Sequence, residues 1–275
     1  MTYELIKKSF LELSDESLIA LHNKISNKCS EYYFLDFLKT TNGNIDDAYL
    51  LFLFDERLRC LLMKYVLRFE IQIKNDFVNV LLKNTNDNYF WSKKENYIFK
   101  DDKEFNNFIN KIEEAFKNLR VSSSTANSYE AAYVMSFGTF VSFYKNIKPS
   151  LKHEFIDAYT DFLPVHSFDV LHKYLLCLRS LRNRCAHGTH IVSQSFVNQL
   201  GQYNALTNEK NAIGKMNSYS VFELTLYYMK KKLNCRNEFS KELKKLLMLN
   251  EQVYSKYGGK QSINPTIIIK LFKKH

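Results

Sequence analysis

The feature that most constrains the fold is a long run without glycine or proline, from Asp47 to Lys83. Its large apolar residues recur at spacings of three and four, which places them on one face of an α-helix. These residues are Leu51, Phe54, Leu58, Leu61, Tyr65, Phe69, Ile73, Phe77 and Val80. At about 1.5 Å per residue the helix would reach on the order of 50 Å. We therefore expect it to form the spine of a helical bundle.

The composition of the chain also favours helices. Only 7 glycines and 3 prolines occur in 275 residues, which leaves little of the turn chemistry that sheets and hairpins need. The 45% hydrophobic content is sufficient to bury a core without crosslinks. The sequence thus predicts an all-α fold.

Several shorter segments share the helical pattern. The remaining helices are expected at 103–120, 129–147 with an interruption at Gly138 and a stop at Pro149, 151–159, 167–188, 219–233 and 238–250. Phe105, Phe108, Ile109, Ile112, Phe116 and Leu119 should share a face of the first, and 121–128 should be a loop. Ser167 and Gly188 fit the N-cap and C′ positions of their helix.

The expected division of the chain has three parts. Residues 1–46 form an N-terminal helical segment, 47–200 form the bundle core, and 201–275 hold basic helices packed on it.

Cysteine usage and apolar runs limit the class of protein. The 5 cysteines form no CxxC pair, which disfavours disulfides and a zinc site and fits a reducing cytosol. The N-terminus lacks an apolar signal segment, and no apolar run approaches the roughly 18 residues of a membrane span. No phosphate-binding loop or HExxH motif is present. We expect a cytoplasmic protein without a metal, a cofactor or a membrane partner.

Positive charge is concentrated near the C-terminus. The formal net charge of the chain is +10. Residues 227–275 contain twelve Lys or Arg and three Glu, so they account for a net charge of +9. This gradient favours a polyanionic partner such as RNA. The expected RNA-binding lysines are Lys230, Lys231, Lys232, Lys244 and Lys245. A well-solvated pair of helices, or the codon bias of an AT-rich genome, would explain the same lysines.

The segment LRSLRNRCAHGTHI, residues 178–191, gathers arginines and histidines. On a helical wheel Leu171, Tyr174, Leu178, Leu181 and Cys185 form a buried stripe. Asn183 and His187 point away from this stripe, whereas Arg182 lies at its edge, where a guanidinium needs an anionic partner. Arg179 and Arg184 either contribute to RNA binding or belong to the ordinary basic surface.

The chemistry of Arg182, Asn183 and His187 suits phosphodiester cleavage without a metal. An imidazole can transfer protons near neutral pH, and a guanidinium can stabilise a phosphorane. RNA supplies its own nucleophile, the 2′-OH. The alternative for His187 is a residue that interacts favourably with a helix C-terminus.

The segment SLRNRCAHGTHI resembles the Arg-Asn-x3-His signature of HEPN domains, and its flanks resemble Abi-like (AbiD/AbiF) abortive-infection proteins. YLLFLFDERLRCLL with RFEIQIKN, MSFGTFVSFYKNI and DFLPVHSF resemble further elements of that family in the same order. The resemblance extends from about residue 47 to 192, and residues 1–46 match poorly. The relatives often continue as His-x-x-Arg, whereas Gly188, Thr189 and His190 follow here.

This resemblance implies a HEPN-like helical bundle, a homodimer with a composite RNase site, and a role in phage defence. It further implies that a structured noncoding RNA binds and restrains the protein. By position, Arg182 would hold the scissile phosphate, His187 would be the general acid/base, and Asn183 would orient His187 or a phosphate. Glu70 would anchor Arg182; its alternative is a surface pair with Lys74.

Three functions follow from these observations. The first is an endoribonuclease that leaves a 2′,3′-cyclic phosphate. The second is a catalytically inactive module that holds a structured RNA. The third is a protein-interaction or membrane-surface factor, which the basic tail IIIKLFKKH would fit.

Overall fold

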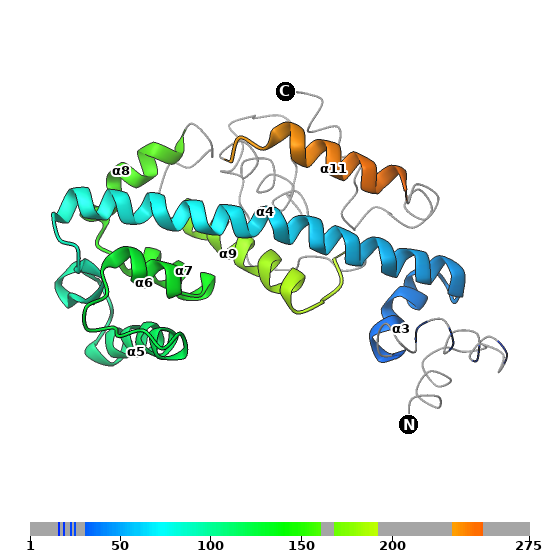
Figure 1. Ribbon diagram of the computed structural model, residues 1–275, viewed down its shortest axis with the longest axis horizontal. Coiled ribbons are helices and arrows are strands. Elements are labelled where there is room, and N and C mark those ends of the chain that lie inside the picture. Colours follow the sequence, from blue (N-terminus) through cyan, green and yellow to red (C-terminus); the bar gives the residue numbers. More distant parts are fainter. Residues whose placement is uncertain are drawn as a thin grey trace. The chain divides into compact units, whose positions relative to one another are not determined.

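The structure, a computed structural model, describes residues 16, 19, 23, 25, 31–160, 168–191 and 233–249. Within these ranges it contains eight α-helices, two short 3₁₀ helices and no strand (Figure 1). The α-helices are α3 (Glu31–Thr40), α4 (Ile45–Thr85), α5 (Asp102–Asn118), α6 (Ser128–Val134), α7 (Phe137–Asn146), α8 (Pro149–Thr160), α9 (Phe168–Ala186) and α11 (Arg236–Met248). The 3₁₀ helices are η1 (Phe90–Ser92) and η2 (Lys94–Asn96). The all-α prediction is thus confirmed for the described part of the chain.

The chain divides into two compact units. The first comprises residues 1–63, 184–197 and 236–275, and the second comprises residues 64–183 and 198–235. Helix α4 passes from the first to the second between Met63 and Lys64, and α9 returns between Asn183 and Arg184. The predicted three-part division stays a prediction.

Helix α4 confirms the long helix predicted around 47–83 and extends it by two residues at each end. Most of the predicted apolar face is buried, from Leu51 to Phe77. The same helix also buries three charged residues, Asp55, Glu70 and Lys74. Because a buried charge is costly unless it is paired, these three residues mark positions where α4 is tied to other segments.

An aromatic core fills the second unit. Phe77 of α4 lies 5.4 Å from Phe143 of α7 and 4.9 Å from Phe155 of α8, measured between ring centroids. Phe108 of α5 stacks on Phe143 at 5.9 Å. Rings at these separations add specific packing energy to their burial. They fix α7 and α8 against α4, and α5 against α7.

The break in the 129–147 segment differs from the prediction. It falls at Met135 and Ser136, between α6 and α7, whereas Gly138 lies inside the first turn of α7. Ser136 is the N-cap of α7, since its side chain accepts a hydrogen bond from the Thr139 amide at 3.1 Å. The N-cap serine therefore sets the boundary, and the glycine does not.

Leu119 lies at the exposed end of the face predicted for α5. Helix α5 ends at Asn118, and Leu119 at its C-cap is 54% exposed. Arg120 then adopts a φ of 58°, so that the chain leaves the helical path just after the predicted face ends. The buried members of that face are Phe105, Phe108, Ile112 and Phe116.

The structure describes one of the two helices predicted near the C-terminus. Helix α11 confirms the helix expected at 238–250, and its buried face contains Phe239, Leu243, Leu246 and Leu247. The helix expected at 219–233, and the N-cap Ser167, lie outside the described residues apart from the turn residue Leu233. No described helix is long and apolar enough to cross a membrane.

Candidate functional site

The sequence motif lies at the C-terminal end of α9. Gly188 has a φ of 72°, and the Thr189 amide donates a hydrogen bond to the Arg184 carbonyl at 3.0 Å. This bond from C″ to C3 is the Schellman closure, so the prediction of Gly188 as the C′ residue is confirmed. The stripe beneath the motif is buried as predicted at Leu171, Leu178, Leu181 and Cys185. The side chain of Tyr174 lies outside the described part of the chain.

Arg182 approaches Glu70 of α4 within the second unit. Its Nε lies 3.7 Å from Glu70 Oε2, and its side chain is 29% exposed. The separation is that of an ion pair and is too long for a hydrogen bond. Both atoms are buried, and neither has a hydrogen-bond partner among the described residues. The predicted proximity of Glu70 and Arg182 is therefore present, in a loosely held form.

Glu70 also pairs with Lys74, but not at the surface. Lys74 Nζ donates to Glu70 Oε1 at 2.8 Å and to the Met135 carbonyl at 2.6 Å. The Glu70 and Lys74 side chains are only 9% and 8% exposed, so the surface location expected for this alternative is wrong. Burial lowers the pKa of Lys74, and the nearby charge of Arg182 lowers it further. One carboxylate thus faces two cations, and the cluster joins α4, the junction of α6 and α7, and α9.

Asn183 and His187 are both exposed, as the helical wheel predicts. Asn183 is the last residue of the second unit in α9. His187 follows the last helical residue, Ala186, and belongs to the first unit. Each side chain is accessible to solvent on its own unit.

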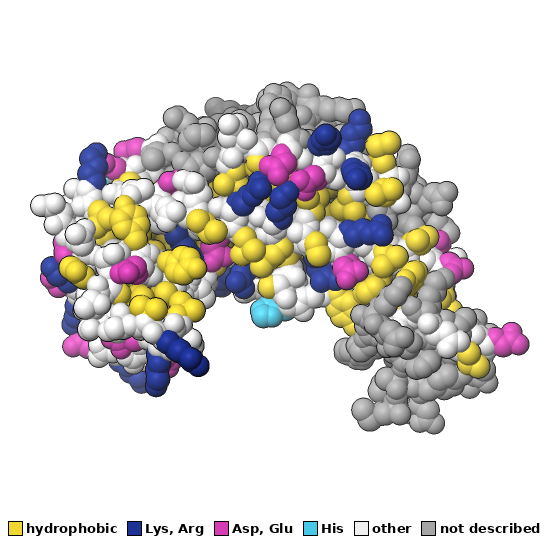
Figure 2. Space-filling model, in the orientation of Figure 1, with side chains coloured by type: hydrophobic (Ala, Val, Ile, Leu, Met, Phe, Trp, Pro, Cys, Tyr) yellow, Lys and Arg dark blue, Asp and Glu magenta, His cyan; other side chains and the backbone are white. Residues whose placement is uncertain are grey.

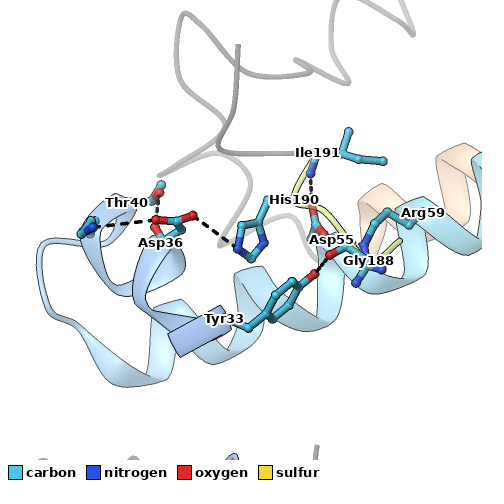
Figure 3. A network of polar contacts seen from close by, with 9 residues as sticks. Tyr33, Asp36, Thr40, Asp55, Arg59, Gly188, His190 and Ile191 are labelled. Atoms are coloured by element: carbon cyan, nitrogen blue, oxygen red, sulfur yellow. Dashed lines mark hydrogen bonds and ion pairs between the residues drawn. The ribbon is translucent and has the colours of Figure 1, made fainter. Parts of the chain in front are cut away.

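His190 is buried in the first unit, where it forms part of the core (Figure 3). Its ring centroid lies 4.3 Å from that of Tyr33 and 4.1 Å from that of Phe37, both on α3. Its Nε2 lies 3.6 Å from Asp36 Oδ2. Burial lowers the pKa of His190, although the carboxylates of Asp55 and Asp36 oppose this shift. His190 therefore holds the segment after the motif against α3.

Asp55 and Arg59 of α4 fix the same segment. The fully buried Asp55 accepts a hydrogen bond from the Ile191 amide at 2.7 Å and one from Arg59 Nε at 2.8 Å (Figure 3). The Tyr33 hydroxyl donates to the Gly188 carbonyl. These contacts give the Asp-x-x-Leu-Arg element a structural role, which the sequence interpretation missed. The available signal was an acidic residue one turn after Leu51, on the apolar face of the helix.

The expected RNA-binding residues occupy different environments. Arg179 is half-buried on α9 in the second unit. Arg184 is half-buried as well, and burial lowers its pKa. Lys244 and Lys245 are exposed on α11, and Lys230, Lys231 and Lys232 lie outside the described residues. Their RNA-binding role stays a prediction.

Within the described ranges, no group of three His, Cys, Asp or Glu side chains is arranged to hold a metal ion. The motif residues Arg182, Asn183 and His187 offer a guanidinium, an amide and an imidazole group for chemistry. The expectation of a metal-free, cofactor-free protein stays a prediction.

The buried His190 predicts a pH-dependent stability. Because its folded pKa is lowered, the unfolded chain binds more protons as the pH falls through the ordinary value of about 6.5. The contribution of His190 to the free energy of unfolding is therefore fully present above about pH 6.5 and is lost as the pH falls below that value. Urea unfolding of the wild type and of His190→Phe should show that the wild type loses more stability between about pH 7.5 and 5.5. The charged residues around the ring, Asp36, Asp55 and Arg59, are the same in both proteins, so a difference between them reports on His190 itself. Equal losses of stability in the two proteins would contradict this role.

A family model matches most of the chain. The model of a family described as Abi-like protein matches residues 24–193, more than half of the 275-residue chain. No curated protein matches the chain, and no solved structure does. The match begins earlier than residue 47, so the expectation that residues 1–46 match poorly is wrong for 24–46. Helix α3 falls in this part, and its Tyr33 and Phe37 pack around His190 after the motif.

Proposed function

The chain belongs to the Abi-like protein family, and we propose that it acts in abortive infection, the bacterial defence against phage, as a metal-independent endoribonuclease. Its substrate would be RNA. Its cleavage residues would be Arg182, Asn183 and His187, which form the Arg-Asn-x3-His motif.

The observation that carries this proposal is the unbalanced charge at Arg182. Glu70 is hydrogen-bonded to Lys74 at 2.8 Å and lies 3.7 Å from Arg182, so its single negative charge faces two positive ones. The remaining positive charge sits on a side chain that is 29% exposed. A phosphate group would neutralise it, and a guanidinium has five N–H donors with which to bind phosphate oxygens.

The proposed reaction needs no metal. His187 removes the proton from a ribose 2′-OH, whose oxygen then attacks the adjacent phosphorus. The bond from phosphorus to the 5′-oxygen breaks, and that oxygen takes up a proton. Arg182 stabilises the charge on the phosphorane, and Asn183 orients the imidazole or a phosphate oxygen. A second copy of the chain in a homodimer would supply the imidazolium that protonates the leaving group.

The proposal is tested by incubating the purified protein with bacterial total RNA in EDTA. We expect the RNA to be shortened, because none of the proposed steps uses a metal ion. RNA that stays intact over a wide range of protein concentrations, with and without Mg²⁺, would refute a nuclease function.

A second candidate function is the retention of a structured noncoding RNA without cleavage. It is favoured by α11, which exposes Lys241, Lys244 and Lys245. Dark-blue basic side chains gather over this helix in Figure 2. Such lysines bind the phosphate backbone without sequence preference. A discrete RNA that co-purifies with the protein and that the protein leaves intact would support this function over cleavage.

A further inference from the structure

A pocket of about 650 Å³ lies in the second unit, and Glu70, Lys74 and Arg182 are not among the residues that line it. It is formed by α5, α7 and α9 and by Phe99, and α5 packs directly on α7. Its volume is within the range of about 300 to 1,000 Å³ that small-molecule sites occupy. The pocket includes the serine, glycine and threonine of the MSFGTF segment, which the proposed cleavage site does not use.

Three cations from three different helices line this pocket. They are Lys111 of α5, Lys145 of α7 and Arg179 of α9. No carboxylate of the described residues forms an ion pair with any of them. The acidic residue of the lining, Glu104, accepts a hydrogen bond from the Lys100 amide at 3.3 Å at the start of α5. The pocket therefore concentrates positive charge in a concave surface, an arrangement that attracts anions.

Two details of the packing support this description. A Cβ atom at Gly138 would stand 3.7 Å from Arg179 Cδ, so the arginine side chain lies across the start of α7 at van der Waals distance. Burial lowers the pKa of the neighbouring His172, and the positive charges of Lys145, Lys152 and Arg179 lower it further. Arg179 thus lies beside the start of α7 at the pocket, and its positive charge also acts on His172, which is earlier on the same helix.

The rest of the lining suits a nucleoside better than a simple anion. Phe99 is half-buried and lines the pocket beside Phe108, with 5.3 Å between the ring centroids, and aromatic side chains of this kind can stack on a base. Asn107 and Ser142 add uncharged polar groups that can bind a base edge or a ribose hydroxyl.

We propose that this pocket binds a phosphate-bearing nucleotide, with Lys111, Lys145 and Arg179 around the phosphate and Phe99 against the base. The nucleotide is either a free effector or one residue of an RNA strand. The inference does not depend on cleavage by the motif residues, because it concerns binding alone.

The test is equilibrium binding to the full-length His187→Ala variant in EDTA, so that cleavage cannot interfere. The probes are AMP, adenosine and a ten-nucleotide single-stranded RNA. AMP should bind at least about tenfold more tightly than adenosine, since charge-assisted hydrogen bonds to phosphate are strong. Adding Lys111→Ala and Lys145→Ala should weaken AMP binding by about tenfold or more. Lys117→Ala, an exposed lysine of α5 outside the pocket, is the matched control and should leave binding within about twofold.

The two sources of the nucleotide give different results. Loss of both AMP and RNA affinity in the double lysine variant supports an RNA strand as occupant, whereas loss of AMP affinity alone supports a free nucleotide. The proposal is overturned if AMP binds no better than adenosine, if the double variant binds AMP like the control, or if no probe binds at millimolar concentration. Circular dichroism melting verifies that the variants are folded.

Discussion

Replacement of His187 by alanine is expected to slow RNA cleavage by about 10²- to 10⁴-fold, because positioned general acid/base groups contribute accelerations of that size. His187 is exposed just after α9, so its replacement should leave the fold intact. The measurement is the initial rate of cleavage of a labelled RNA in EDTA under single-turnover conditions. RNA binding should change little in the same variant, since the imidazole acts on protons.

His153→Ala is the matched control for this prediction. His153 is exposed on α8, and its ring packs edge-on against Phe168. The His153→Ala variant should cleave RNA at the wild-type rate. If His187→Ala and His153→Ala cleave equally, the histidine of the motif is not the acid/base, and His187 serves only the end of the helix.

Glu70→Ala is expected to lower the free energy of unfolding by about 3 to 5 kcal/mol, because it leaves two cations beside each other without their carboxylate. Lys74 is 8% exposed and donates to Glu70, and Arg182 lies 3.7 Å from the same carboxylate. Urea denaturation followed by circular dichroism measures the loss. Cleavage should also fall in this variant, since Arg182 loses the group that positions it.

The control for Glu70 is Glu56→Ala, which removes an exposed carboxylate from the same helix and should cost less than about 0.5 kcal/mol. The double variant Glu70→Leu with Lys74→Met should lose less stability than the sum of its single variants, because it removes one buried cation with the anion. A Glu70→Ala protein as stable as the Glu56→Ala protein would show that this cluster contributes nothing to folding.

The helices and the end of the motif helix could be predicted from local patterns. Apolar residues at spacings of three and four identify α4, and a glycine after the last apolar residue marks the end of α9. These features depend on a few neighbouring residues and on backbone geometry. The exposure of Asn183 and His187 could be predicted from a helical wheel of residues 178–191.

The long-range polar contacts could not be predicted in this way. Lys74 donates to the Met135 carbonyl, 61 positions further along the chain, and Asp55 accepts from the Ile191 amide, 136 positions away. Nothing in the neighbouring sequence specifies such partners. His190 is a similar case, since nothing near it in the sequence specifies the aromatic rings of α3 that bury it.

The most direct test of the central claim is the chemistry of the RNA ends produced by purified wild-type protein in EDTA. Mass spectrometry of the fragments should show 2′,3′-cyclic phosphates and 5′-hydroxyls, and an RNA with 2′-O-methyl groups throughout should remain uncut. Fragments with 5′-phosphates and 3′-hydroxyls, cleavage of the 2′-O-methyl RNA, or cleavage only when Mg²⁺ is added would contradict a metal-independent reaction at Arg182, Asn183 and His187.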